Sequence, residues 1–354
     1  MIRFRHLTAA TGAAALALGV MAGAAQAQKY ELKMTSYVSA KGGFWTNYQQ
    51  KFIDAVELFT NGEVKIKGFS IGVIAGAFDG LQAVQKGTAD ISYNYPGYNV
   101  NEDPANGVFG NVPGGMPMEQ FMHWYIAGDG TKLLEEFRHK TQQLHPVLSG
   151  MGSSEFLLHS HKPVRNIADL KGMKIRTAGP WADILKSLGA SATVIPGPEI
   201  YTALERRVID ATEFVTPATN IKLGFHKVAK YIIMPGLHSP SHMNEAVFKL
   251  ETWNKMSKRI RDLISAAGEL SAFQTAMTMG AQDFDAMEKL LAGKNEFITL
   301  TPEAQARIEE LGRAWCAEQA KAQKAKGNDW MERISGNYWA FYDRYKKYGV
   351  YRHN

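Results

Sequence analysis

The 354-residue sequence contains a single cysteine, Cys316. One cysteine excludes an internal disulfide, a cysteine-rich zinc site and a CxxC redox motif. Cys316 stands within a helical apolar stripe, which favours a packing role over a nucleophilic one. Glycine and proline, at 33 and 13 residues, are too few for a collagen-like or linker-dominated chain. With 45% hydrophobic and 21% charged residues, the chain has the composition of a globular protein.

The sequence also lacks a dense cluster of lysine and arginine, although its formal net charge is +6. It contains no RNP, helix-turn-helix or zinc-finger pattern. We therefore interpret the basic balance as a solvated surface of mixed charge and expect no nucleic-acid partner.

Long hydrophobic runs are absent after the N-terminus. Residues 1–5 include two arginines, Arg3 and Arg5. Small and apolar residues follow from Ala9 to Ala24, and Ala25-Gln26-Ala27 fits the small-x-small rule. The apolar run falls short of the ~20 residues that cross a bilayer, so residues 1–27 are predicted to be a signal peptide cleaved after Ala27. The mature protein is then expected in the periplasm, where no ATP pool exists, and no organic cofactor is expected.

Strand-like runs alternate with helical patterns, which predicts an α/β fold with mostly parallel sheets. In a first round, strands are expected at 32–37, 64–67 and 89–93, with a helix stopped by Asn61-Gly62 and a short helix ending at Gly87. A second round begins near 173. Its strands are expected at 173–176, 192–195 and 209–214, and its helices at 181–188 and 199–206.

The two rounds share a short local pattern. Residues 83–86 with Asp90 resemble residues 203–206 with Asp210. We therefore predict two similar βαβ-type lobes around a ligand cleft, as in periplasmic binding proteins, with crossovers of the same hand. The first lobe is expected to comprise 28–153 with part of 237–290.

The second lobe is expected to comprise 154–236 with part of 290–354. Beyond the lobes the chain is helical, with a long helix at 258–291 and a helix start at Thr301-Pro302-Glu303. Residues 301–354 should form C-terminal helices. Aromatic and apolar residues there recur at helical spacing, which favours packing within the chain and leaves a homodimer contact as the alternative. They are Trp330, Ile334, Tyr338, Phe341 and Tyr345.

Ligands of open α/β sheets bind beyond the carboxyl ends of the strands. In the second lobe these ends hold Arg176 and Glu213. A guanidinium offers a planar fork of donors that matches a carboxylate. Glu155 follows a glycine- and serine-containing stretch, 150–154, where the chain is expected to cross between the lobes.

Several linked motifs resemble one known family. The segment 169–176, Asp-Leu-Lys-Gly-Met-Lys-Ile-Arg, is similar to the DLKG-x-K-x-R element of the DctP-like substrate-binding proteins of TRAP transporters. The stretches 201–213 and 223–231 and Pro235-Gly236 resemble the branch of that family that binds 2-oxo acids. The likeness covers most of the mature chain and is densest from 165 to 236.

The resemblance implies a non-enzymatic, bilobed periplasmic receptor that closes on a small organic acid and delivers it to TRAP membrane subunits. It implies that Arg176 binds the ligand carboxylate. It also implies that Glu213 and the carbonyl of Phe214, where the branch has tryptophan, hold a cation such as Ca²⁺ or Na⁺ that bridges the ligand.

Glu155 departs from the branch, which has glutamine at the matching position. Two glutamates and a ligand carboxylate carry three negative charges against one positive charge on Arg176, and burying that imbalance is costly. A divalent cation such as Ca²⁺ held by Glu155 and Glu213 balances the sum. The alternative is that Glu155 pairs directly with Arg176 and weakens acid binding.

A second departure lies at 237–242, where the branch carries tryptophans and an acid and this chain has Leu-His-Ser-Pro-Ser-His. We expect this changed wall to admit a larger or more polar acid than pyruvate. Tyr95 and Tyr98 are candidate contacts from the opposite wall, with loop packing as the alternative. Asn220 completes the set of candidate ligand-binding residues.

The competing functional hypothesis is a secreted metal-dependent hydrolase. Four histidines are the available zinc ligands: His159, His161, His238 and His242. No HExxH, GxSxG, P-loop or GxGxxG pattern is present, which favours the receptor.

Overall fold

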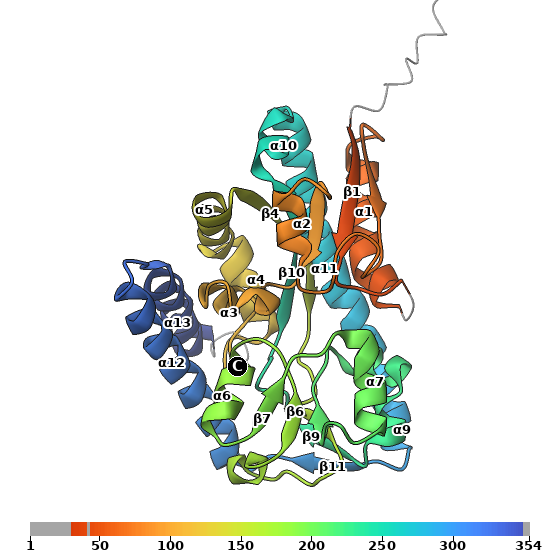
Figure 1. Ribbon diagram of the computed structural model, residues 1–354, viewed down its shortest axis with the longest axis vertical. Coiled ribbons are helices and arrows are strands. Elements are labelled where there is room, and N and C mark those ends of the chain that lie inside the picture. Colours follow the sequence, from red (N-terminus) through yellow and green to blue (C-terminus); the bar gives the residue numbers. More distant parts are fainter. Residues whose placement is uncertain (1–29, 41–42, 350–354) are drawn as a thin grey trace, which may run out of the picture.

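The computed structural model describes residues 30–40 and 43–349. Two mixed β-sheets form the centres of two lobes, which lie one above the other in Figure 1. The predicted α/β fold with two lobes is therefore confirmed. The predicted signal peptide lies outside the described residues. None of the helices in the described part of the chain is both long and apolar enough to cross a membrane.

The first sheet has five strands in the order β2-β1-β3-β10-β4. Strands β2, β1 and β3 run parallel, and β10 runs antiparallel to β3 and to β4. The strands are β1 (Tyr30–Ser36), β2 (Val64–Gly68), β3 (Ile91–Asn94), β4 (Leu144–Gly152) and β10 (His242–Lys249).

The second sheet has six strands in the order β11-β9-β5-β8-β6-β7. Strands β8, β6 and β7 run parallel, whereas β5 is antiparallel to both β8 and β9. The strands are β5 (Leu158–Ser160), β6 (Lys174–Arg176), β7 (Ser191–Thr193), β8 (Ala211–Thr212), β9 (Tyr231–Met234) and β11 (Glu296–Thr299). The prediction of mostly parallel sheets was thus too simple. In the first sheet β10 runs antiparallel to both of its neighbours, and in the second sheet β5 does so.

Helices cover both sheets. Those of the first lobe and its neighbourhood are η1 (Trp45–Gln49), α1 (Gln50–Phe59), α2 (Gly80–Gln85), η2 (Pro96–Asn99), α3 (Ala105–Phe109), α4 (Met118–Ile126), α5 (Gly130–Gln142) and α10 (Leu250–Lys255). The remaining ones are η3 (Ile167–Leu170), α6 (Pro180–Ser187), α7 (Gly197–Glu205), α8 (Pro217–Leu223), α9 (Phe225–Val228), α11 (Lys258–Leu291), α12 (Pro302–Lys324) and α13 (Trp330–Tyr348). The helices expected from periodicity are confirmed within a few residues.

The predicted likeness between the two rounds has a structural counterpart. Asp90 accepts a hydrogen bond from the backbone N–H of Lys33, in the middle of β1, at 2.7 Å. Asp210 accepts the equivalent bond from the N–H of Lys174 at 2.9 Å. Each carboxylate therefore ties the loop after a short helix to the first strand of its own unit. The three-strand units β2-β1-β3 and β7-β6-β8 share one spatial order.

Three segments connect the sheets. The chain passes from β4 to β5, returns from β9 to β10, and passes again from α11 to β11. The first two crossing segments pair with each other through an antiparallel bridge between Glu155 and Gly236. The bridge places residues 155 and 236–239 side by side between the lobes, which is where the functional candidates gather.

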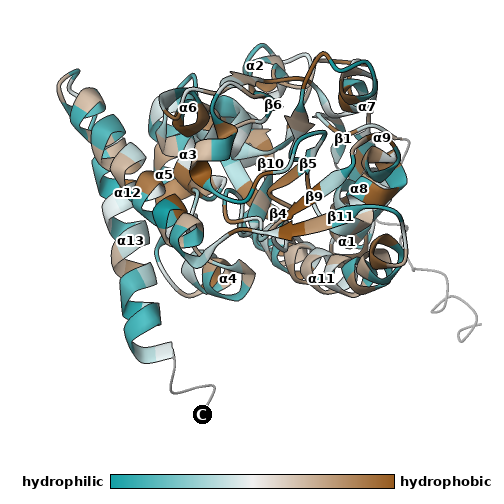
Figure 2. Cartoon of the chain, turned by 90° about the horizontal axis from the view of Figure 1, so that it is seen from below, coloured by the Kyte–Doolittle hydropathy of each residue, from teal (hydrophilic) through white to brown (hydrophobic). Residues whose placement is uncertain are grey.

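The aromatic stripe at the C-terminus packs within the chain. Helices α12 and α13 lie against each other along one side of the molecule (Figure 2). Tyr338 is fully buried, donates a hydrogen bond to Asn111 Oδ1 at 2.5 Å and accepts one from the N–H of Met116 at 2.6 Å. Ile334 is also fully buried. The inner part of this stripe therefore serves the core, as its 3.6-residue period indicates.

Candidate functional site

A narrow cavity of about 40 Å³ lies between the lobes, beside the two crossing segments. Its wall combines aromatic side chains with a compact group of charged ones. The lining residues are Tyr37, Phe44, Tyr95, Tyr98, Asn111, Glu155, Arg176, Ala178, Pro180, Trp181, Glu213, Phe214, Val215, His238, Ser239 and His242. The sequence predicted six of these as ligand or metal contacts.

Arg176 is the last residue of β6, and its side chain is 1% exposed. Its Nε donates to the carbonyl of Ile195 at 3.0 Å, and its Nη1 donates to the carbonyl and to the Oε1 carboxylate oxygen of Glu213 at 3.1 and 3.2 Å. The third nitrogen, Nη2, is buried without a hydrogen-bond partner. A buried, unpaired guanidinium N–H is costly, so this group is poised for an acceptor that enters the cavity.

Glu213 follows β8 and anchors Arg176 from the neighbouring strand. Its Oε1 also accepts a hydrogen bond from the backbone N–H of Ala178 at 3.1 Å. Burial by itself raises the pKa of Glu213, but the Arg176 guanidinium and His238 outweigh burial and lower this pKa to about 2. Glu213 is therefore an anion at neutral pH.

Glu155 lies in the first crossing segment. Its backbone N–H donates to the carbonyl of Ser239 at 3.3 Å, and its Oε1 accepts from the Ser239 hydroxyl at 3.1 Å. Its Oε2 is buried without a hydrogen bond. Burial raises the pKa of Glu155 to about 7, helped by the charge of Glu213 and opposed by His238. The proposed alternative, a direct pair between Glu155 and Arg176, is wrong, because Arg176 pairs with Glu213 instead.

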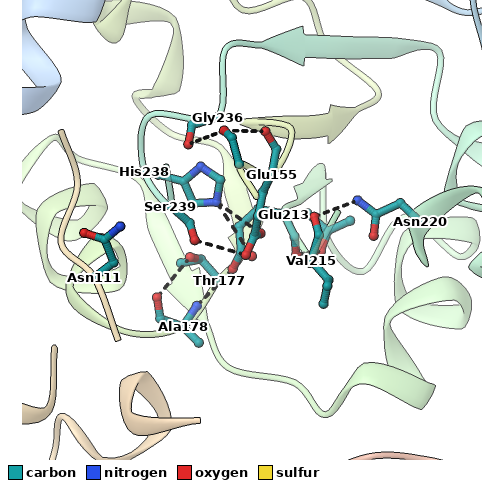
Figure 3. Close-up of polar contacts among 12 residues, drawn as sticks. Asn111, Glu155, Thr177, Ala178, Glu213, Val215, Asn220, Gly236, His238 and Ser239 are labelled. Atoms are coloured by element: carbon teal, nitrogen blue, oxygen red, sulfur yellow. Dashed lines mark hydrogen bonds and ion pairs between the residues drawn. The ribbon is translucent and has the colours of Figure 1, made fainter. Parts of the chain in front are cut away.

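His238 joins the two glutamates (Figure 3). Its Nε2 lies 3.4 Å from Glu155 Oε2 and 3.8 Å from Glu213 Oε2, and the residue is 5% exposed. Burial disfavours the imidazolium, but the two carboxylates raise the pKa of His238 to about 9. The sequence placed His238 in a changed wall at 237–242 and among the possible zinc ligands of the hydrolase hypothesis, but not among the expected ligand or cation contacts of the receptor. The available signal was its position two residues after Pro235-Gly236, where the chain departs from the resembled branch.

Glu155, Glu213 and His238 form a candidate metal centre. One ligand atom from each of them lies within 4.8 Å of the other two. Two carboxylates and an imidazole are a donor set found on divalent cations, with the oxygens favouring Ca²⁺ and the nitrogen favouring transition metals. Glu155 Oε2 and His238 Nε2 are buried and face each other at 3.4 Å without a hydrogen bond, so both atoms can turn to an ion that enters between them.

The aromatic candidates lie where the sequence predicted them. Tyr95, Tyr98 and Phe214 all line the cavity. The Phe214 ring centroid is 5.0 Å from the Arg176 guanidinium carbon, a cation–π distance. Burial raises the pKa of Tyr98, whereas the nearby charge of Arg176 lowers it. The Tyr95 hydroxyl points to the carbonyl of Gly110 at 3.5 Å.

Asn220 is not part of the cavity wall, so its prediction as a ligand contact is not supported by its position. The residue is buried in α8, where its Nδ2 donates to the carbonyl of Val215 at 3.5 Å (Figure 3). Its side chain therefore fastens the start of the helix to the segment after Phe214.

The four histidines of the hydrolase hypothesis do not converge. His159 is buried on β5 with its ring against Phe156 and Phe225, and the ring Nε2 of His161 donates to the carbonyl of Leu204 at 2.8 Å. Only His238 and His242 reach the cavity. Cys316 is buried, and burial raises the pKa of its thiol to about 12, which agrees with a packing role.

Comparison with known proteins defines the family. The chain matches the family described as bacterial extracellular solute-binding protein, family 7, over residues 35–323. A monocarboxylate 2-oxoacid-binding periplasmic protein of Nostoc is 27% identical over 252 residues, which cover 71% of this chain and 69% of that protein. The chain belongs to the family 7 extracellular solute-binding proteins.

Solved structures show the same fold. A TRAP transporter solute-binding protein from Bordetella bronchiseptica, a dimer with calcium and picolinate, superposes with a TM-score of 0.84 at 22% identity and covers 92% of this chain and 94% of that one. A TRAP periplasmic solute-binding protein from Pseudoalteromonas atlantica, with sodium and pyruvate, also gives 0.84 at 21% identity, covering 91% and 97%.

Proposed function

We propose that this protein is a periplasmic receptor that captures a small monocarboxylate of the 2-oxo or 2-hydroxy type and delivers it to TRAP membrane subunits. The observation that carries the proposal is the free, buried Nη2 of Arg176 in a cavity between two lobes. The bound carboxylates in the similar structures, pyruvate and picolinate, support this ligand class.

Arg176 supplies the anion-binding group. Glu213 and the carbonyl of Ile195 hold two of its guanidinium nitrogens in place, so the third is pre-oriented before the ligand arrives. A carboxylate oxygen that accepts from Nη2 gains a charge-assisted hydrogen bond in a site shielded from water. Because Nε and Nη1 are already engaged, the fork that the sequence suggested is reduced to this one nitrogen.

The proposed receptor has a place for a cation beside the ligand. Glu155, Glu213 and His238 would hold it, and it would supply the positive charge that a second ligand oxygen requires. Two carboxylates, a ligand anion and Arg176 sum to −2, so a divalent cation beside a neutral His238 makes the closed site neutral. Without a cation or ligand, the positive charges of Arg176 and of an imidazolium at His238 together neutralise the two negative charges of Glu155 and Glu213.

The protein is proposed to bind without turnover. The family to which the chain belongs consists of solute-binding proteins, which supports binding without chemistry. The proposal includes export by the predicted signal peptide, residues 1–27, with cleavage after Ala27.

Titration calorimetry tests this function. Protein purified from the periplasm and dialysed against chelator is titrated with pyruvate, lactate and picolinate, each with and without Ca²⁺, Na⁺, Mn²⁺ or Zn²⁺. Saturable binding that is tightened by a cation, with the acid recovered unchanged, is expected. Product formation, or the absence of binding to every acid under every condition, would overturn the proposal.

A further inference from the structure

A second cavity of about 230 Å³ adjoins the charged one. The two share four wall residues: Tyr37, Phe44, Tyr98 and Phe214. Side chains therefore separate the two spaces, and all four are half-buried rather than fully packed.

Both lobes contribute to this second cavity. Val38, Ser39 and Ala77 come from loops after β1 and β2. Gly197 and Pro198 begin α7, and α8 provides Thr219 and Leu223. The cavity therefore forms between the lobes, as the charged one does.

The wall of this second cavity is apolar. None of the described residues that line it carries a charge, and its polar groups are hydroxyls. Four aromatic rings belong to it, with Tyr37 in ring contact with Phe44 at 6.0 Å and with Tyr98 at 5.3 Å. The charged cavity next to it holds Arg176, two glutamates and His238. One continuous site would thus have a charged end and an apolar end.

We propose that the second cavity receives the apolar substituent of the acid whose carboxylate binds Arg176. The ligand class is then a monocarboxylate with a branched aliphatic or aromatic group, and pyruvate is a weak member of it. This inference rests on the proposed function and names its substrate class.

The volumes of the two cavities indicate which part of the ligand each one can hold. The charged cavity, about 40 Å³, holds roughly three water molecules at about 10–15 Å³ each, so it suits a carboxylate with its neighbouring oxygen. The second cavity, about 230 Å³, is larger than an apolar cavity of about 150 Å³ that stays dry and accepts benzene. Because the second cavity is partly open to solvent, an apolar substituent that enters it displaces water from the apolar wall and gains contacts with the side chains there.

A series of acids with one head group tests the inference. Calorimetry compares pyruvate, 4-methyl-2-oxopentanoate and phenylpyruvate under the best cation condition. Each buried CH₂ is expected to tighten binding about fourfold, so the two larger acids should bind at least about tenfold more tightly than pyruvate. Binding of pyruvate with equal or weaker binding of the larger acids overturns this inference and leaves the proposed function intact. Failure of all three acids counts against the proposed function itself.

A matched pair of variants locates the substituent. Ala77→Phe fills the second cavity from a surface loop, and Val73→Phe adds the same ring to the same loop at a site 63% exposed that lines neither cavity. Ala77→Phe should weaken phenylpyruvate at least about tenfold and leave pyruvate within about twofold, whereas Val73→Phe should change neither. Unchanged phenylpyruvate binding in folded Ala77→Phe, verified by thermal melting, would place the substituent elsewhere and refute the inference.

Discussion

The guanidinium of Arg176 is held by the protein on two of its three nitrogens. Nε and Nη1 donate to protein oxygens, and the guanidinium lies near the Phe214 ring. The third nitrogen, Nη2, has no hydrogen-bond partner in the protein. A buried cation is tolerated because Glu213 lies beside it. The arrangement keeps the guanidinium charged and fixed in the absence of ligand, which lowers the ordering cost when the acid binds.

Replacement of this side chain should abolish most ligand affinity. We expect Arg176→Ala to lose about 2–5 kcal/mol of binding free energy in calorimetry, since one side of a buried charge-assisted contact is removed. Arg313→Ala is the control, because Arg313 makes a partly exposed ion pair between α12 and α13. Unchanged binding by Arg176→Ala would show that the carboxylate is held elsewhere.

Glu213 should determine the cation dependence. Glu213→Gln keeps a hydrogen-bond acceptor for Arg176 but removes a charged metal ligand, so we expect cation affinity to fall at least about tenfold in a cation titration. Glu199→Gln, which changes an exposed acid of α7, should behave as the unchanged protein. An equal loss of acid affinity with and without cation would indicate a structural role for Glu213.

Some residues of this site could be predicted from the sequence and others could not. Arg176 ends β6 and Glu213 directly follows β8, so the strand pattern places both side chains at carboxyl ends of strands, and the parallel pairing of β6 with β8 brings them together. His238 lies in a crossing segment without regular structure, and no periodicity indicates which way its ring points. Asn220 lies outside the cavity wall for a related reason, since the direction of its side chain depends on how α8 packs.

At the scale of elements, the site depends on two crossing segments that touch. Glu155 and Gly236 form an isolated antiparallel bridge, and a methyl group at position 236 would collide with the carbonyl oxygen of Glu155. Glycine is therefore required here by close approach of two backbones. The contact brings Glu155 and His238 into the same cluster.

Gly236→Ala should separate these segments. We expect a loss of about 1–3 kcal/mol in the free energy of unfolding, with weaker acid binding, because the clash is with backbone that cannot move freely. Gly336→Ala is the matched control: no atom lies within 4 Å of an added methyl group on the exposed face of α13. We expect Gly336→Ala either to leave the free energy of unfolding unchanged or to raise it by about 0.5–1 kcal/mol. Denaturant melts of both proteins measure the difference, and equal stability of the two would contradict the role given to the bridge.

Local patterns predicted the parallel units well and the antiparallel strands poorly. The helix over 258–291 and the capped start at Thr301 are local features, and the structure has both. The strands β5 and β10 are reached only after the chain crosses between lobes. Their direction depends on contacts with strands far away in sequence, which no local window contains.

The whole molecule contains buried histidines that make its stability depend on pH. Burial, with help from His226, lowers the pKa of His159 to about 3, and burial with His139 and Arg261 lowers that of His145 to about 3. Their ordinary value is about 6.5, so between about 6.5 and 3 the unfolded chain binds protons that the folded chain does not. Stability should therefore fall as the pH falls through this window, by about 1.4 kcal/mol per pH unit for each histidine.

His159→Leu isolates one of these contributions. Its unfolding free energy, measured by denaturant melts from pH 7 to pH 5, should fall less steeply than that of the unchanged protein, by about 1.4 kcal/mol per pH unit below 6. Carboxylates contribute to both proteins equally, so the difference between the slopes reports His159. Identical slopes would mean that the buried imidazole is already protonated in the folded state.

The sequence by itself determined the local elements, the two similar strand–helix units and the arginine at a strand end, because periodicity, capping and strand polarity act over short stretches of chain. Only the tertiary structure decided that His238 stands between Glu155 and Glu213, and that an apolar cavity adjoins the charged one. Both features arise where segments from the two lobes meet. Their geometry is set by how whole lobes pack across a gap, and that information is distributed over the entire core.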